Sequence, residues 1–292
     1  MNRNAGAPLI EVAGLRVRDD VRDLVSAVDL RVEPGDRVGI IGESGSGKSL
    51  TALSILGLLP HPLRASGTVV VGGTDMITAR GRAGDRVRGS TVTAIFQEPL
   101  TSLDPLMTVG RQLAWPIVRH QGLRGRELRA AVLESLRDVR LPDPERVARA
   151  HIHEISGGQR QRVAIAIALA CRPRVLIADE PTTALDVTVQ AGILDLLDTA
   201  VRERGMALVL ISHDLAVVSR VTDRVLVMRD GREVEEGAVR RILTAPADPY
   251  TAQLVAAARA LEAHLPRVPE GGTARSPGDR TADRGPTGGE RA

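Results

Sequence analysis

Apolar and polar positions along this chain follow two different periods. Residues 9–17, 28–32 and 67–71 alternate between the two kinds, which predicts strands with one buried face. Uninterrupted apolar runs predict buried strands at residues 38–41, 175–178 and 207–211, and a further strand is predicted at 91–96. Helices are predicted at residues 50–59, 159–171, 186–204 and 251–264. The repeated exchange of strand and helix predicts an α/β fold.

The pattern changes between about residue 98 and residue 157. One helical face there is formed by Leu128, Val132, Leu136 and Val139. The helical pattern is broken by Pro105, Pro116, Pro142 and Pro144. We therefore expect a mostly helical insertion, about 98–157, in the α/β fold.

The C-terminal part contains a hairpin signal and a segment without a core pattern. Asp230-Gly231 is flanked by residues 224–228 and 232–234, and this pair of turn residues predicts a tight β-hairpin. Beyond Pro266 the only large aliphatic residue is Val268, too little apolar surface to offset the entropy of folding. We expect one folded domain over residues 1–265 and a disordered tail over residues 266–292.

The composition narrows the classes of partner. Hydrophobic residues make up 43% of the 292 residues, but there is only one residue each of Phe, Trp and Tyr. So few stacking side chains argue against a single-stranded nucleic-acid binder, and a net charge of +3 with dispersed arginines gives no reason to expect a nucleic-acid partner. The longest apolar run, residues 163–171, is far shorter than the ~20 residues of a membrane span, so any membrane role requires a partner.

Lys48 is the only lysine among the 39 basic residues of the chain. It lies in a segment that matches the phosphate-loop pattern G-x-x-x-x-G-K-[ST], between a predicted strand and a predicted helix. A compact ammonium on a flexible stem can reach between backbone amides to the β- and γ-phosphates, whereas a planar guanidinium cannot. The predicted nucleotide-binding residues are Gly42, Glu43, Ser44, Gly45, Ser46, Gly47, Lys48 and Ser49.

Two carboxylates follow the buried strand predicted at residues 175–178. In phosphate-loop enzymes a carboxylate at this place holds Mg²⁺ together with the hydroxyl of the loop. Asp179 and Ser49 are the corresponding candidates for a Mg²⁺ site. Glu180, one residue further, is the candidate for polarising a water molecule beside the γ-phosphate.

A second candidate anion site lies at the start of the helix predicted at residues 159–171. Ser156 is a suitable N-cap, and Gly157 and Gly158 allow another backbone to approach closely. With this segment, the motifs occur in the order found in ATP-binding-cassette (ABC) ATPases, which residues 8–265 resemble. The resemblance rests on residues 42–49, Gln97, residues 156–159, Asp179-Glu180, residues 184–186 and His213. It implies a phosphate-loop NTPase fold of the ABC type, with an antiparallel β subdomain and a helical insertion.

The resemblance implies a role for each matching residue, with ATP and Mg²⁺ as cofactors. Gln97 is similar to the glutamine that senses Mg²⁺ and the transporter, and His213 to the histidine that contacts the γ-phosphate. Asp186 resembles the aspartate at the seam of a dimer. The signature motif, which closes on ATP held by the opposite subunit, corresponds to Ser156, Gly157, Gly158 and Gln159. The implied active form is a head-to-tail pair of ATPase subunits.

A narrower likeness concerns importers. The segments that carry it are residues 96–99, 101–105, 153–154, 180–186 and 249–251, which look like those of dipeptide, oligopeptide and nickel importer ATPases. That likeness implies two membrane permeases, an extracytoplasmic solute-binding protein and a peripheral position on the cytoplasmic face of the cell membrane. It favours a pair of two different ATPases, although two copies of this chain remain an alternative.

Two other functions and one departure from the family stay open. A soluble, non-transport cassette ATPase usually has two cassettes or long coiled coils, and this chain has neither. Exporters often fuse the cassette to membrane spans, but an exporter ATPase on a separate chain is not excluded. Residues 17–21 lack the aromatic side chain that commonly stacks on adenine, and Arg18 is the candidate to replace it.

Overall fold

The computed structural model describes residues 7–79, 81–97, 103–183 and 186–264. Three predicted features lie wholly or partly outside the described residues: the tail (266–292), the importer-like segments where they overlap residues 98–102, and residues 184–185. Among the described helices, none combines the length with the apolar character needed to cross a bilayer.

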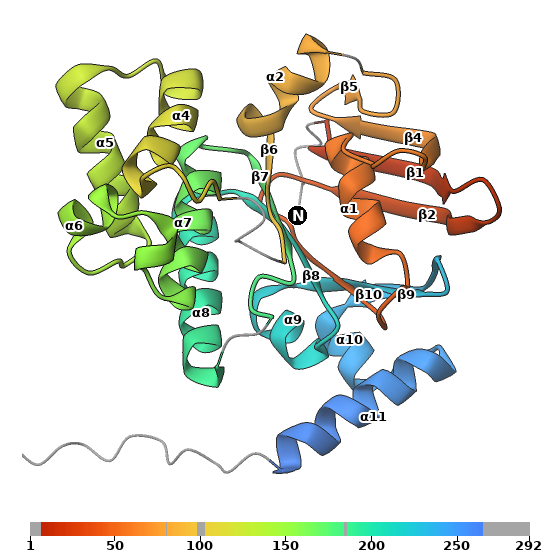
Figure 1. Cartoon of the computed structure of the whole chain (residues 1–292). Coiled ribbons are helices and arrows are strands. Elements are labelled where there is room, and N and C mark those ends of the chain that lie inside the picture. Colours follow the sequence, from red (N-terminus) through yellow and green to blue (C-terminus); the bar gives the residue numbers. More distant parts are fainter. Residues whose placement is uncertain (1–6, 80, 98–102, 184–185, 265–292) are drawn as a thin grey trace, which may run out of the picture.

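A six-stranded sheet in the order β10-β9-β3-β8-β7-β6 forms the centre of the molecule (Figure 1). Its neighbouring strands run parallel, except for the antiparallel hairpin of β9 and β10. The turn of that hairpin is Asp230-Gly231, and both residues have positive φ, as the sequence predicted. The strands are β3 (Arg37–Ile41), β6 (Val92–Ile95), β7 (Val175–Asp179), β8 (Ala207–Ser212), β9 (Arg224–Arg229) and β10 (Arg232–Ala238).

A second, antiparallel sheet has the order β2-β1-β4-β5. Its strands are β1 (Ile10–Arg18), β2 (Asp23–Val32), β4 (Arg64–Val71) and β5 (Thr74–Asp75). Helix α1 (Lys48–Leu56) contacts β1, β2 and β4 of this sheet and also β7 of the central one (Figure 1). The predicted α/β fold with an antiparallel part is confirmed.

The middle strands of the central sheet, β3, β8 and β7, are buried on both faces because they consist mostly of apolar residues. Along β7, Leu176 and Ala178 belong to one hydrophobic core, and Val175 and Ile177 belong to the other. The second of these cores also contains the apolar residues of α1 and of the antiparallel sheet. Alternate residues of one strand thus join two layers, as expected for a parallel sheet covered on both sides.

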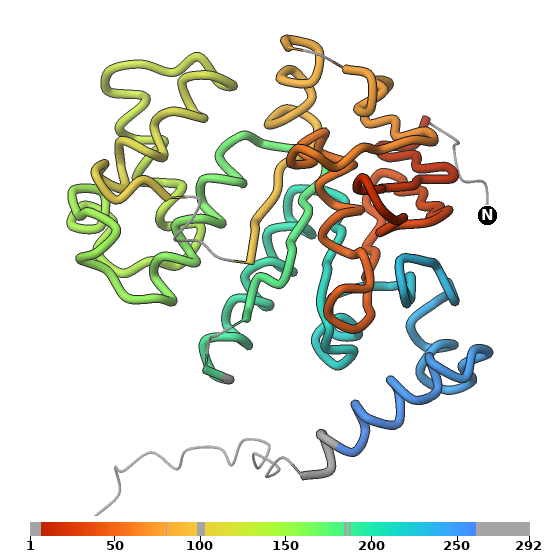
Figure 2. The backbone as a smooth tube through the Cα atoms, turned by 45° about the vertical axis from the view of Figure 1, so that its right-hand side comes forward, coloured from red at the N-terminus to blue at the C-terminus, as the bar shows by residue number. Residues whose placement is uncertain are grey.

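Helices cover the other face of the central sheet and form the insertion, and Figure 2 shows the insertion on one side of the molecule. The helices that follow β6 are α4 (Val109–Gln121), α5 (Gly125–Asp138), α6 (Pro144–Arg149), η1 (Ile152–Glu154), α7 (Gly157–Ala170), α8 (Val187–Arg204), α9 (Leu215–Val221), α10 (Val239–Thr244) and α11 (Pro249–His264). A short helix, α2 (Arg82–Ser90), precedes β6.

The expected break at Pro116 is wrong, because α4 continues through this residue. A proline inside a helix removes one backbone hydrogen bond and costs about 3 kcal/mol or more. Leu113 and Ile117, on either side of the proline, are fully buried in the core next to α7. Their packing holds the helix together on both sides of the proline.

Candidate nucleotide site

Four neighbouring strands of the central sheet deliver the candidate residues to one edge. The phosphate loop follows β3, His213 follows β8, Glu180 follows β7, and Gln97 lies two residues after β6. These strands are parallel and adjacent, so their carboxyl ends meet at the same edge. Ligands of open α/β sheets bind outside this edge.

Glycines at two positions of the phosphate loop allow its tight path. A Cβ atom on Gly42 would lie 2.1 Å from the carbonyl oxygen of Met228. Gly47 has φ +98° and is the N-cap of α1, a conformation that strains any side-chain-bearing residue. The loop therefore lies directly against β9 and turns at once into the helix.

The Lys48 ammonium lies inside this loop. Its Nζ donates to the carbonyl oxygens of Gly42, at 2.7 Å, and Glu43, at 2.8 Å. Only 6% of the residue is exposed. Burial lowers the pKa of Lys48, while the carboxylates of Glu180 and Asp179 act in the opposite direction. The cation is thus held by two backbone oxygens that phosphate oxygens can replace.

The first turn of α1 offers an anion site. No side chain caps the helix, and no acidic residue stands in its first turn. The free backbone N–H groups and the helix dipole favour a phosphate at this end. The Ser46 hydroxyl is also buried without a hydrogen-bond partner. The free N–H groups at the start of α1 fit a nucleotide phosphate, whereas the Ser46 hydroxyl does not line the cavity.

Asp179 fits a divalent cation. It is 5% exposed, and its Oδ1 atom is buried without a hydrogen-bond partner. Burial raises the pKa of Asp179, and the neighbouring charge of Glu180 adds to this, whereas a hydrogen bond from Ser49 and the charge of Lys48 lower it. A buried carboxylate with a free oxygen next to a hydroxyl is an oxygen donor set of the kind that Mg²⁺ prefers.

Replacing Asp179 with asparagine is expected to stabilise the nucleotide-free protein. Because the pKa is raised, the stability that Asp179 contributes is greatest below its unfolded pKa and is lost as the pH rises through its folded pKa. At pH 7, Asp179→Asn should raise Tm by about 2–4 °C, the shift that roughly 1 kcal/mol produces. It should also abolish the additional stabilisation that Mg²⁺ gives in the presence of ATP.

Thermal denaturation with EDTA, and then with ATP and Mg²⁺, measures both effects. The exposed Asp20 provides the control, because Asp20→Asn should change neither quantity. A lower Tm for Asp179→Asn in EDTA would contradict the prediction.

Glu180 is held by two side chains. The Thr183 hydroxyl donates to Oε2 at 2.8 Å, and His213 Nδ1 lies 3.1 Å from Oε1. Burial acts to raise the pKa of Glu180, but the net shift is downward because of these two hydrogen bonds and the charges of His213 and Lys48. The carboxylate is therefore ionised at neutral pH in a fixed orientation.

One cavity of about 660 Å³ is lined by most of these groups, but Asp179 is not among its lining residues. Its lining includes the loop from Gly42 to Leu50 without Ser46, together with Gln97, Glu180, Thr183, His213 and Leu254. The sequence had assigned no role to Thr183 or to Leu254. Thr183 lies within the importer-like segment that begins at Glu180, but its contact with the carboxylate requires the turn that only the folded chain shows.

The residues of the second predicted anion site lie elsewhere. Ser156 and Gln159 form a capping box, in which the Gln159 N–H donates to Ser156 Oγ at 3.3 Å and the Ser156 N–H donates to Gln159 Oε1 at 3.0 Å. Asp186 caps α8 by accepting from the Val189 N–H at 2.9 Å. Neither group is among the described residues that line the cavity around Lys48.

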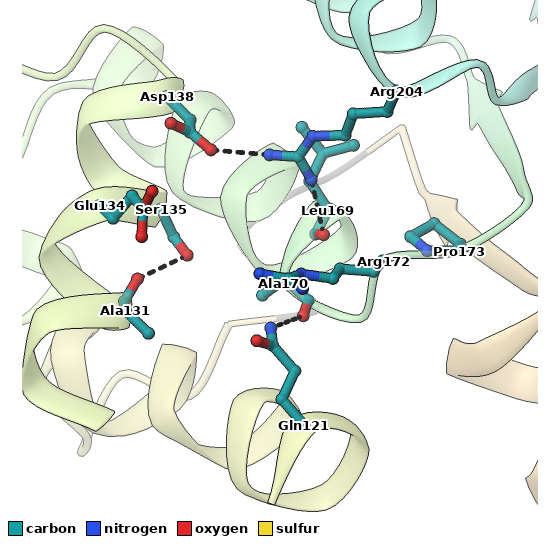
Figure 3. A pocket seen from close by; sticks show the side chains of 10 residues that line it. All are labelled: Gln121, Ala131, Glu134, Ser135, Asp138, Leu169, Ala170, Arg172, Pro173 and Arg204. Atoms are coloured by element: carbon teal, nitrogen blue, oxygen red, sulfur yellow. Dashed lines mark hydrogen bonds and ion pairs between the residues drawn. The ribbon is translucent and has the colours of Figure 1, made fainter. Parts of the chain in front are cut away.

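Another hollow, of about 420 Å³, lies between the helical insertion and the ends of α7 and α8 (Figure 3). Arg204 bridges it, donating to Asp138 at 2.7 Å and to the Leu169 carbonyl at 2.9 Å. Gln121 donates to the Ala170 carbonyl at 2.7 Å. The Arg204, Asp138 and Gln121 side chains are thus already hydrogen-bonded within the protein. Their contacts attach the helical insertion to the ends of α7 and α8.

Comparisons with known proteins agree with this geometry. The family model of ABC transporters matches residues 25–183. A putative peptide import ATP-binding protein of Brucella melitensis biotype 1 is 45% identical over 272 residues, which are 90% of this chain and 81% of that protein. The peptidoglycan transport ATP-binding protein YejF of Agrobacterium fabrum is 51% identical over 235 residues, 80% of this chain but only 43% of that protein.

A solved structure shows the same fold. It is a dimer of the ATP-binding cassette MJ0796 in a post-hydrolysis state, bound to ADP and Pi. The TM-score is 0.70 at 29% identity, with 79% of this chain and 99% of that chain covered. The chain belongs to the ABC transporter family, as one of its ATP-binding subunits. It is an ATPase of the phosphate-loop class.

Proposed function

We propose that this chain is the ATP-hydrolysing subunit of an importer for peptides or small peptide-like solutes. The observation that carries the proposal is the 45% identity to a putative peptide import ATP-binding protein along 90% of the chain. The likeness to YejF, a peptidoglycan transport ATP-binding protein, also points to the ATP-binding part of a transporter. The ATPase domain is proposed to span residues 1–265, with its helical subdomain at about 98–157.

The site residues divide into binding and reacting groups in this proposal. Lys48 and the amides of the phosphate loop bind the β- and γ-phosphates. Ser49 and Asp179 hold Mg²⁺, with Gln97 as a further ligand, and the cation neutralises charge on the phosphates when it is bound. Glu180 accepts a proton from the attacking water, and His213 holds that carboxylate through the 3.1 Å contact.

The complete site is proposed to form between two ATPase subunits. Ser156 to Gln159 and Asp186 lie outside the lining of the cavity of their own chain, and Ser156 and Gly157 at the start of α7 are exposed. In a head-to-tail pair, the signature residues of one subunit close over ATP held by the other. The dimer of MJ0796 supports pairing, and the importer-like segments favour two different ATPases.

Outside the cassette, the proposal includes two membrane permeases and an extracytoplasmic solute-binding protein. The chain is then a peripheral subunit on the cytoplasmic face of the membrane, and no nucleic-acid partner is proposed. The groups that touch ATP do not touch the cargo, because cargo passes through the permeases.

Capture from native membranes tests this assignment. The bait is tagged chain carrying Glu180→Gln, with ATP and Mg²⁺ present to retain the closed pair. We expect multi-span permeases and a second ATPase in the eluate. We also expect a solute-binding protein that binds peptides, either captured with them or encoded beside them. A bait that also carries Lys48→Ala is the control and should lose the second ATPase. Recovery of ribosomes or other soluble machinery without permeases would overturn the transport assignment.

A further inference from the structure

Helix α11 begins directly beside the phosphate loop. The only tyrosine of the chain, Tyr250, lies in the first turn of this helix and is 4% exposed. Its hydroxyl oxygen accepts the backbone N–H of Glu43 at 3.0 Å. On the other side, the Arg229 guanidinium lies over the tyrosine ring, 4.9 Å from its centroid. A residue more than 200 positions away in sequence therefore contacts the second position of the loop.

The amide that Tyr250 binds belongs to the peptide unit that also holds Lys48. The N–H of Glu43 and the C=O of Gly42 lie on opposite edges of one planar peptide unit. The N–H edge faces the Tyr250 hydroxyl at 3.0 Å, and the C=O edge accepts from Lys48 Nζ at 2.7 Å. Rotation of this unit would break both contacts together, so the tyrosine and the lysine ammonium are coupled through a single plane.

This peptide unit needs a restraint because it follows a glycine. Gly42 is required where a Cβ would meet Met228, but a glycine also gives its peptide unit more rotational freedom than other residues allow. The Lys48 contact cannot supply the restraint by itself, since the ammonium is the group that must turn towards phosphate. Tyr250 is not among the described residues that line the cavity, so its hydroxyl can keep its contact with the unit when the Lys48 ammonium leaves the opposite edge for phosphate.

Tyr250 is itself held firmly. The Glu235 carboxylate, 8% exposed, accepts the N–H groups of Ala247 at 3.0 Å and Asp248 at 3.1 Å, and it pairs with Arg241 at 2.9 Å. Asp248 Oδ1 in turn accepts the Tyr250 N–H at 2.7 Å. These contacts fix the turn into α11, and with it the position of the tyrosine.

We propose that Tyr250 is a positioning residue for nucleotide binding, which fixes the Gly42–Glu43 peptide unit and thereby the place from which Lys48 meets the phosphates. The proposal rests on ATP binding by the phosphate loop and is independent of the cargo. It gives a role to the segment 249–251, which the importer likeness had marked without assigning one.

Removing only the hydroxyl tests the proposal. Tyr250→Phe keeps the ring under Arg229 but leaves the Glu43 N–H without its acceptor. The dissociation constant for Mg·ADP, measured by calorimetry on the full chain, is expected to rise about fivefold to tenfold, as for loss of one well-placed hydrogen bond. Tm without nucleotide is expected to change little, because the packing of the ring is retained.

Val255→Ala is the matched control on the same helix. Val255 is 4% exposed and does not line the nucleotide cavity, so its truncation should lower Tm and leave the Mg·ADP affinity within about twofold. A merely structural role for Tyr250 predicts that Tyr250→Phe behaves like Val255→Ala. An unchanged dissociation constant for Tyr250→Phe would overturn the proposal.

A second measurement reports on the contact directly. Incorporation of 3-fluorotyrosine labels position 250 alone, because the chain has one tyrosine. Its fluorine resonance is expected to shift when Mg·ADP, or inorganic phosphate alone, enters the loop. The same label in a Lys48→Ala chain should not respond to phosphate. A resonance that is indifferent to Mg·ADP in a chain shown by calorimetry to bind it would overturn the coupling.

Discussion

Arginine at position 48 is expected to lower the affinity for ATP by about two orders of magnitude, although the charge is retained. The Lys48 ammonium sits between two carbonyl oxygens at 2.7 and 2.8 Å in a loop whose backbone lies against Met228. A guanidinium is planar and wider, and it cannot occupy this space without moving the loop. Two charge-assisted hydrogen bonds to phosphate are worth about 3 kcal/mol together, which is roughly 10²-fold in affinity.

Titration of the full chain with a fluorescent ATP analogue measures this loss. Arg202→Lys makes the reverse exchange on α8, where the Arg202 side chain is 65% exposed and pairs with Asp198, and it should leave the affinity unchanged. If the affinity of Lys48→Arg for ATP were within threefold of that of the unmodified chain, the positive charge at position 48 would be enough for binding. The shape of the lysine side chain would then not be required.

The predictability of the fold depended on burial. Strands β7 and β8 are apolar at every position except the last, so the sequence pattern located them to within one residue. Helix α9 was missed because seven residues are too few to show a helical period. Its N-cap Asp214, which accepts from the Ala216 N–H at 2.8 Å, lies only two residues after the end of β8. Helix α1 ends at Leu56, earlier than its apolar period predicted, because Gly57 takes the left-handed conformation.

The candidate site was predictable where its chemistry is local in sequence. The phosphate loop and the pair Asp179-Glu180 each lie within one short segment, and the spacing of residue types is enough to recognise them. The Thr183 and His213 contacts of Glu180, and the Tyr250 contact of the loop, join separate turns or distant segments, so only the folded chain shows them. The signature residues are a further case, because their proposed ligand belongs to another subunit.

The two carboxylates at the carboxyl edge of the central sheet, Asp179 and Glu180, have pKa values shifted in opposite directions. Asp179 has a raised pKa because of burial, whereas hydrogen bonds and nearby cations outweigh burial at Glu180 and lower its pKa. The stability that Glu180 contributes is therefore present above its unfolded pKa and is lost as the pH falls through its folded pKa. At neutral pH the Glu180 carboxylate is therefore deprotonated, and the buried Asp179 carboxylate has an oxygen without a hydrogen-bond partner.

Glutamine at position 180 is accordingly expected to stop turnover while ATP binding persists. Glu180→Gln keeps the size of the side chain and an oxygen for the Thr183 hydroxyl, but it removes the carboxylate proposed to accept the proton of the attacking water. Loss of a general base costs about 10²–10⁴-fold in rate. Affinity for ATP should stay within about threefold, because Lys48 and the loop amides are unchanged.

Phosphate release by the complex purified through this chain, together with ATP binding at equilibrium, separates the two quantities. Thr183→Val should give an intermediate loss, about tenfold, because the carboxylate keeps its charge and loses one of the two contacts that orient it. Glu203→Gln, on the exposed surface of α8, should leave both quantities unchanged. If Glu180→Gln turned over ATP at the normal rate, the proton would have to pass to another group, and His213, 3.1 Å from the same carboxylate, would be the residue to substitute next.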